Sequence, residues 1–182
     1  MYKILLMSLL LTTIGSHAQT TESQKWVDSV FKTLTPEEQI AQLMVVRLST
    51  INTNKTVTFF DKEVAELIKQ YNIGSVCLFQ GSPVQQANIL NSLQAIAKTP
   101  LLVTIDAEWG VGMRMTDSVL PLPRQMMLGA GQDSSIAYEY GKIVAQQCKR
   151  MGIQVNSAPV VDVNNNPNNP VINDRSFGED KY

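Results

Sequence analysis

The chain has 182 residues, with 15 basic and 16 acidic side chains and a formal net charge of −1. The basic residues are dispersed along the sequence, so nothing in the charge pattern indicates nucleic-acid binding. The only histidine is His17, and the two cysteines, Cys77 and Cys148, fall in unrelated predicted elements. We therefore predict no metal site and no cofactor, and packed thiols in preference to a disulfide.

Residues 1–18 have the pattern of a secretory signal peptide. Lys3 supplies a positive charge, residues 4–14 are apolar, and Ala18 offers the small residue that signal peptidase requires. The apolar run is shorter than the roughly 20 residues of a membrane span. We expect an exported protein, periplasmic or secreted from a bacterium, with no stable membrane insertion after cleavage. Residues 19–34 read as a polar leader followed by a short helix.

From Thr35 onward, short apolar runs alternate with amphipathic segments. Thr35 as N-cap and Pro36 at the first helical position predict a helix start, and Gly74 suits a left-handed helix cap. Residues 49–58 read as a polar loop. We expect strands at 43–48, 75–79, 101–105 and from 156, and helices at 60–71, 83–98 and 134–151. This alternation predicts an α/β fold with a parallel sheet of right-handed βαβ units.

The apolar run 101–105 leads directly into a charged segment with Asp106, Glu108 and Arg114. Paired carboxylates are typical of glycoside hydrolysis. We expect the side chains of Asp106 and Glu108 to diverge where the strand ends, which would make them a poor acid/nucleophile couple. Asp106 is better suited to accept hydrogen bonds from sugar hydroxyls, with Arg114 either donating to the same ring or orienting the carboxylate. Trp109 could stack on a sugar face or pack internally.

Residues 156–180 begin as a strand and turn into a loop rich in asparagine and proline. The loop carries Arg175, which composition alone would leave as a solvated charge. Asp162 could organise the loop or touch a ligand, whereas Glu179 and Asp180 read as carboxylates that fix its path. A calcium loop starting at Asp162 is excluded, because its sixth position is proline instead of glycine and its twelfth lacks glutamate.

Three ordered motifs carry a family resemblance: D-x-E-x-G-x-x-x-R at 106–114, N-x-A-P-V-x-D-V at 156–163, and N-P-x-x-P-V-I-x-x-R-S-F-G-E-D at 166–180. Together they resemble the N-terminal domain of glycoside hydrolase family 3, in its bacterial β-N-acetylhexosaminidase and β-glucosidase branch. The resemblance covers 35–182 and implies a (β/α)8 TIM-type barrel of which about the first four β/α units are present. Because a complete barrel takes about 250 residues, we expect a longer protein with this domain truncated at Tyr182.

The resemblance also implies a function. Asp106, Arg114 and Arg175 would bind the sugar in the −1 subsite, converging at one end of the sheet. The nucleophile and the acid/base are expected beyond Tyr182, so this chain supplies no catalytic residue and should be inactive alone. The expected activity is exo-acting, retaining removal of terminal β-linked N-acetylhexosamine, such as N-acetylglucosamine, from a carbohydrate substrate that includes cell-wall material. The alternatives are a β-glucosidase of the same family or a non-catalytic carbohydrate-binding pseudoenzyme.

Overall fold

The computed structural model describes residues 21–115 and 117–180; the predicted signal peptide lies outside this part. The chain divides into two units, Met1–Thr33 and Leu34–Tyr182. In the first unit, helix α1 (Glu22–Phe31) begins where the Thr21 side chain accepts a hydrogen bond from the Gln24 N–H at 3.2 Å. No helix within the described ranges is both long and apolar enough to cross a membrane.

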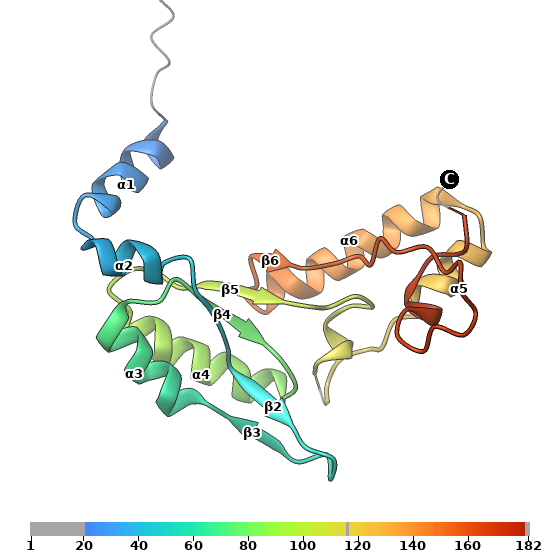
Figure 1. Ribbon diagram of the computed structural model, residues 1–182, viewed down its shortest axis with the longest axis horizontal. Coiled ribbons are helices and arrows are strands. Elements are labelled where there is room, and N and C mark those ends of the chain that lie inside the picture. The colour runs from blue at the N-terminus through green and yellow to red at the C-terminus, as the bar shows by residue number, and fades with distance from the viewer. Residues whose placement is uncertain (1–20, 116, 181–182) are drawn as a thin grey trace, which may run out of the picture. The chain divides into compact units, whose positions relative to one another are not determined.

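The second unit is built on a parallel sheet of four strands, in the order β1-β4-β5-β6 (Figure 1). All three strand pairs are parallel, with Arg47, Cys77 and Thr104 in register across β1, β4 and β5. The predicted α/β fold with a parallel sheet is confirmed. The strands are β1 (Val45–Arg47), β4 (Ser75–Leu78), β5 (Leu102–Ile105) and β6 (Val155–Asn156).

Helices connect the strands, and their starts follow local chemistry. Thr35 and Glu38 form a capping box at the start of α2, as the sequence predicts for this N-cap: the Thr35 hydroxyl accepts from Glu38 N–H at 3.2 Å, and the Glu38 carboxylate accepts from Thr35 N–H at 2.9 Å. The helices are α2 (Pro36–Ala41), α3 (Asp61–Tyr71), α4 (Pro83–Ile96), α5 (Gln125–Ala130) and α6 (Ser134–Arg150), with short 3-10 turns η1 (Val111–Met113) and η2 (Asn173–Arg175).

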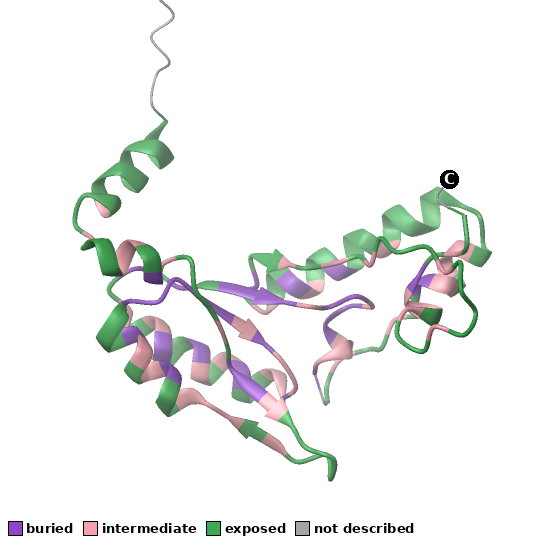
Figure 2. Ribbon diagram, viewed as in Figure 1, coloured by how far each residue is buried: buried purple, intermediate pink, exposed green. Residues whose placement is uncertain are grey.

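The core lies between one face of the sheet and helices α3, α4 and α6 (Figure 2). Alternation along each strand sends every second side chain to this face, and the intervening residues to the other. The opposite face carries Arg47, Cys77 and Thr104, which share one register row. The side chains buried in the core include Val76, Leu78, Val103 and Ile105 from the sheet, and Val64, Ile68, Leu90 and Leu93 from the helices.

Gly74 does not form the left-handed helix cap expected of it. Asn72 takes that conformation, with φ of 55°, and its side-chain amide donates to Thr99 Oγ1 at 3.0 Å. Asparagine tolerates the left-handed region better than most residues because its short polar side chain can hydrogen-bond locally. Glycine is required two residues later for a different reason: a Cβ at Gly74 would collide with the main chain of Gln42.

Three further differences from the sequence prediction concern connections. Residues 49–58 form an antiparallel hairpin instead of a loop, made by β2 (Ser49–Ile51) and β3 (Val57–Phe59). Strand β6 pairs over only two residues, because the chain soon reaches Pro159, which has no N–H to donate to a ladder. Helix α5 lies in a stretch for which the sequence predicted neither a helix nor a strand.

Candidate functional site

The candidate site lies where β5 and β6 end, at the carboxyl edge of the parallel sheet. This edge is where barrels and open α/β sheets place their ligand sites. Asn156, at the end of β6, clamps the start of the loop after β5. Its Oδ1 accepts from Ala107 N–H at 2.9 Å, and its Nδ2 donates to the Ala107 carbonyl at 3.3 Å. The first and second sequence motifs are thus joined by a pair of hydrogen bonds.

Arg114 returns to Asp106 through a tight turn. The turn begins at Gly110, whose φ of 81° is costly for other residues, and continues through η1. Arg114 Nε donates to the Asp106 carbonyl at 3.0 Å, and Nη2 lies 3.5 Å from Asp106 Oδ2. The Asp106 side chain remains 39% exposed, against 15% for Arg114. This geometry has Arg114 orienting Asp106 and leaves the carboxylate accessible to a ligand.

Arg175 binds Glu108, although 67 positions separate them in the sequence. Its Nε and Nη2 donate to the two carboxylate oxygens of Glu108 at 2.8 and 2.7 Å, which is a bidentate pair. The Glu108 side chain is only 7% exposed, so its charge is buried together with a partner. Hydrogen bonding to Glu108 is the main cause that raises the pKa of Arg175 above its ordinary value.

The loop that carries Arg175 is braced at further points. Ser176 Oγ lies 2.7 Å from the Asp162 carbonyl, so the main chain of Asp162 helps to organise the loop. Arg124, the residue before α5, donates to both carboxylate oxygens of Asp174 at 2.7 and 2.9 Å. The same guanidinium covers one face of the Trp109 ring, at 4.5 Å from its centre. Trp109 is therefore packed on that face by the protein itself.

Asp106, Arg114 and Arg175, the three predicted site residues, thus lie on the two loops that leave β5 and β6. The sequence did not reveal Glu108 as the partner of Arg175. It also missed Phe79, whose ring has the guanidinium carbons of Arg47 and Arg114 each 4.7 Å from its centre. Strand alternation could have signalled Phe79, because it shares a strand face with Cys77.

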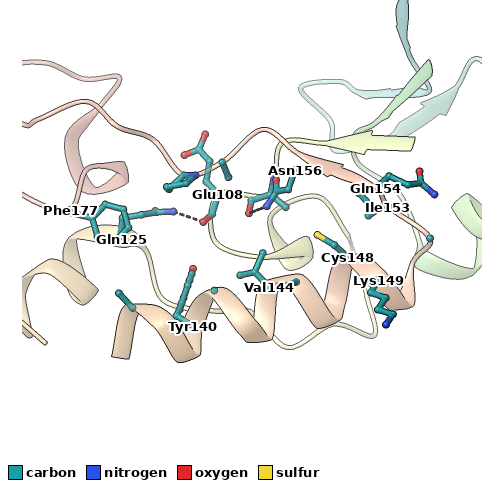
Figure 3. Close-up of a pocket in the computed structure, with 17 residues that line it drawn as sticks. Glu108, Gln125, Tyr140, Val144, Cys148, Lys149, Ile153, Gln154, Asn156 and Phe177 are labelled. Atoms are coloured by element: carbon teal, nitrogen blue, oxygen red, sulfur yellow. Dashed lines mark hydrogen bonds between the residues drawn. The ribbon is translucent and has the colours of Figure 1, made fainter. Parts of the chain in front are cut away.

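Helix α6 and the ends of β5 and β6 line an open pocket of about 560 Å³ (Figure 3). Its lining is mainly apolar, with Val144 and Cys148 from α6. The Gln125 amide donates to the Glu108 carbonyl, while the buried Gln125 Oε1 has no partner. Burial raises the pKa of Tyr140 to about 12 and also raises the pKa of the Cys148 thiol.

Cys77 and Cys148 are both free thiols, with Cys148 buried in α6 and Cys77 half-buried in β4. Burial is the main cause that raises the Cys77 pKa. Among the residues that the structure describes, no group of three or more histidine, cysteine or acidic side chains is placed to hold a metal ion.

The amino-acid sequence is similar to those of known proteins. The chain is 37% identical over 135 residues to beta-hexosaminidase A of Pseudoalteromonas piscicida, covering 68% of this chain and 23% of that protein. It is 24% identical over 155 residues to a beta-N-acetylglucosaminidase/beta-glucosidase of Cellulomonas fimi, covering 85% of this chain and 26% of that protein. The chain therefore spans about a quarter of the length of these relatives.

A solved structure supports the same relationship. The fold matches a glycoside hydrolase family 3 beta-N-acetylglucosaminidase from Paenibacillus sp. str. FPU-7 with a TM-score of 0.69 and 34% identity, over 81% of this chain and 28% of that one. The sheet and helices are thus those of a partial TIM-type barrel, as predicted. The sequence model described as "Glycosyl hydrolase family 3 N terminal domain" matches residues 35–182. The chain belongs to glycosyl hydrolase family 3, as part of its N-terminal domain.

Proposed function

We propose that this chain supplies the sugar-binding part of an exo-acting, retaining glycoside hydrolase that removes terminal β-linked N-acetylhexosamine residues, with N-acetylglucosamine as the main substrate sugar. The complete protein would be exported and would act on carbohydrate that includes cell-wall material. One observation carries the proposal: Asp106, Arg114 and Arg175 lie on the loops after two adjacent strands, at the edge where barrel enzymes bind substrate. The printed activities of the relatives support the choice of sugar.

In this proposal the residues of the chain bind and orient the sugar. The exposed Asp106 carboxylate accepts hydrogen bonds from hydroxyl groups, and Arg114 holds that carboxylate in place. Arg175 has five N–H donors, of which two bind Glu108 and one binds the Val171 carbonyl at 3.1 Å. Two donors remain for a ligand. Holding the sugar in one orientation lowers the barrier to reaction at its anomeric carbon.

Asp106 and Glu108 are each engaged by an arginine, so neither is assigned as nucleophile or general acid. A retaining mechanism needs two carboxyl groups about 5–5.5 Å apart, one of which forms the covalent glycosyl-enzyme. We propose that both come from the part of the complete protein that follows Tyr182, and that this chain alone is inactive.

A β-glucosidase is the second candidate, because the relative from Cellulomonas fimi carries both activities in its name. Carboxylate and guanidinium contacts to ring hydroxyls suit glucose and N-acetylglucosamine equally. Reading the coding sequence beyond Tyr182 and assaying the complete protein with chromogenic β-N-acetylglucosaminide and β-glucoside distinguishes the two. Turnover of neither substrate by folded protein would favour a non-catalytic carbohydrate-binding protein.

Alanine substitutions test the roles of the binding residues. In the complete protein, Asp106→Ala and Arg175→Ala should each lower kcat/KM by about 10- to 150-fold, because a hydrogen bond to a charged group contributes about 1.5–3 kcal/mol and about 1.36 kcal/mol equals tenfold. Glu179→Gln, in the same loop as Arg175 but exposed, is the matched control and should stay within about twofold of wild type. Near-normal kinetics for both alanine variants, with normal folding, would contradict the assignment.

A further inference from the structure

Glu108 is held from two sides. Its carboxylate is buried against Arg175, which occupies both oxygens, and its main-chain carbonyl accepts the buried amide of Gln125. The preceding residue, Ala107, is clamped by Asn156. In Figure 3 the Gln125 amide meets the main chain of Glu108, while the carboxylate points away from helix α6. Glu108 is therefore a fixed anchor on which the Arg175 guanidinium rests.

The anchor sets the direction of the guanidinium. Three of its five N–H groups are committed, two to Glu108 and one to Val171, so the plane of the guanidinium cannot rotate without breaking hydrogen bonds. The two remaining N–H groups then point in a defined direction. A planar donor pair of this kind binds two oxygens of a ligand without further loss of side-chain freedom.

The Glu108 carboxylate also compensates the positive charge of Arg175. Glu108, Asp162 and Asp174 all raise the pKa of Arg175 through their negative charges, and Arg124 pairs with Asp174. Three carboxylates and two guanidinium groups leave this cluster with a net charge of −1, from −3 and +2. A ligand with its own carboxylate would therefore gain no electrostatic attraction here. Hydroxyl and amide groups of a neutral sugar carry no net charge, so the negative charge of the cluster does not weaken their binding.

We propose that Glu108 is a positioning residue that fixes Arg175 and neutralises its charge, so that this end of the site selects an uncharged sugar over a uronic acid. The inference rests on the proposed sugar site, and it adds a residue and a specificity rule to it. Selectivity of this kind comes from the missing attraction for the wrong ligand as much as from contacts to the right one.

The substitution Glu108→Gln tests this selectivity, because glutamine has nearly the same size as glutamate but no charge. A glutamine keeps one acceptor oxygen for Arg175 but removes the negative charge, so the cluster becomes neutral and Arg175 is freed to attract an anion. In the complete protein, we compare the affinities for N-acetylglucosamine and glucuronate. The variant should bind glucuronate at least about fivefold more tightly than wild type, and this gain should shrink at high salt because salt screens the attraction. Its kcat on the neutral glycoside should fall about tenfold, because a misplaced donor is costly in the transition state.

Three comparisons make the result decisive. Glu179→Gln removes one negative charge from the same loop without touching Arg175, and should leave the ratio of the two ligand affinities unchanged. Glu108→Asp keeps the charge on a shorter side chain, so it should lose kcat but still reject glucuronate. Adding Arg175→Gln to Glu108→Gln should abolish the gain in glucuronate binding.

An unchanged ratio of glucuronate to N-acetylglucosamine affinity in folded Glu108→Gln would overturn the inference, and so would an equal gain in Glu179→Gln. If Glu108→Gln does not fold, Glu108→Asp decides, because acquired glucuronate binding in that variant would contradict charge compensation. The two ligands are measured by calorimetry, which requires no turnover. Absence of glycoside hydrolysis by wild type would therefore count against the proposed activity and not against the selectivity rule.

Discussion

Replacing Gly129 with alanine tests how the loop that carries Arg175 is held against α5. A Cβ built at Gly129 lies 2.6 Å from the carbonyl carbon of Phe177 and 3.1 Å from its Cα. The Phe177 carbonyl oxygen would be nearer still, and carbon atoms pack at about 3.5–4.0 Å, so one backbone must move by more than about 1 Å. Both contacting groups are main chain, so no side-chain rotation relieves the overlap. The expected loss of stability is about 1–3 kcal/mol, the usual cost of overpacking.

The displacement should also reach the site, because Phe177 follows Arg175 by two residues. A shift of about 1 Å in a binding group can lower activity by about 100-fold. We therefore expect Gly129→Ala to lower both the thermal midpoint and kcat/KM of the complete protein. A shift of roughly 2–4 °C per kcal/mol is expected for a domain of 150–250 residues.

Gly141 provides the matched control. It lies within helix α6, and a Cβ there would meet no atom within 4 Å. Gly141→Ala should stabilise the protein by about 0.5–1 kcal/mol, since glycine in a helix interior is less favourable than alanine, and should leave kinetics unchanged. A Gly129→Ala protein with the stability and kcat/KM of wild type would show that the loop does not rest on α5 as described.

Two other predictions concern pH and export. Tyr140 donates to the Pro123 carbonyl at 2.8 Å and its pKa is raised to about 12, so the folded state holds this proton more tightly than the unfolded chain does. Its contribution to stability should be complete below pH 10, the ordinary value, and disappear as pH rises towards 12. Thermal unfolding from pH 9 to 12 should show this decline, and Tyr140→Phe should reduce it; the same slope in both proteins would refute the assignment. For export, N-terminal sequencing of protein from the periplasmic fraction should begin near Gln19, and protein that keeps Met1 in the cytoplasm would contradict it.

Much of the local structure could be predicted because it depends on neighbouring residues. The capping box at Thr35 needs only a hydroxyl and a carboxylate three residues apart, and apolar runs bounded by helices are sufficient to place three strands of the sheet. The pairing of Asp106 with Arg114 was similarly within reach, because only a short turn separates them. The spacing left open whether Arg114 binds the ligand or orients Asp106. Only the folded structure shows that Arg114 binds Asp106.

The amino-acid sequence by itself determined the alternation of strands and helices, the family, and the residues worth testing. Only the tertiary structure decided that Glu108 anchors Arg175 and that Asn156 clamps Ala107, because these pairs lie 67 and 49 positions apart. It also decided that Asn72 takes the left-handed conformation while Gly74 allows a close main-chain approach. Local periodicity reports which face a side chain takes on its own element. It carries no information on which distant loop the folded sheet brings against that face.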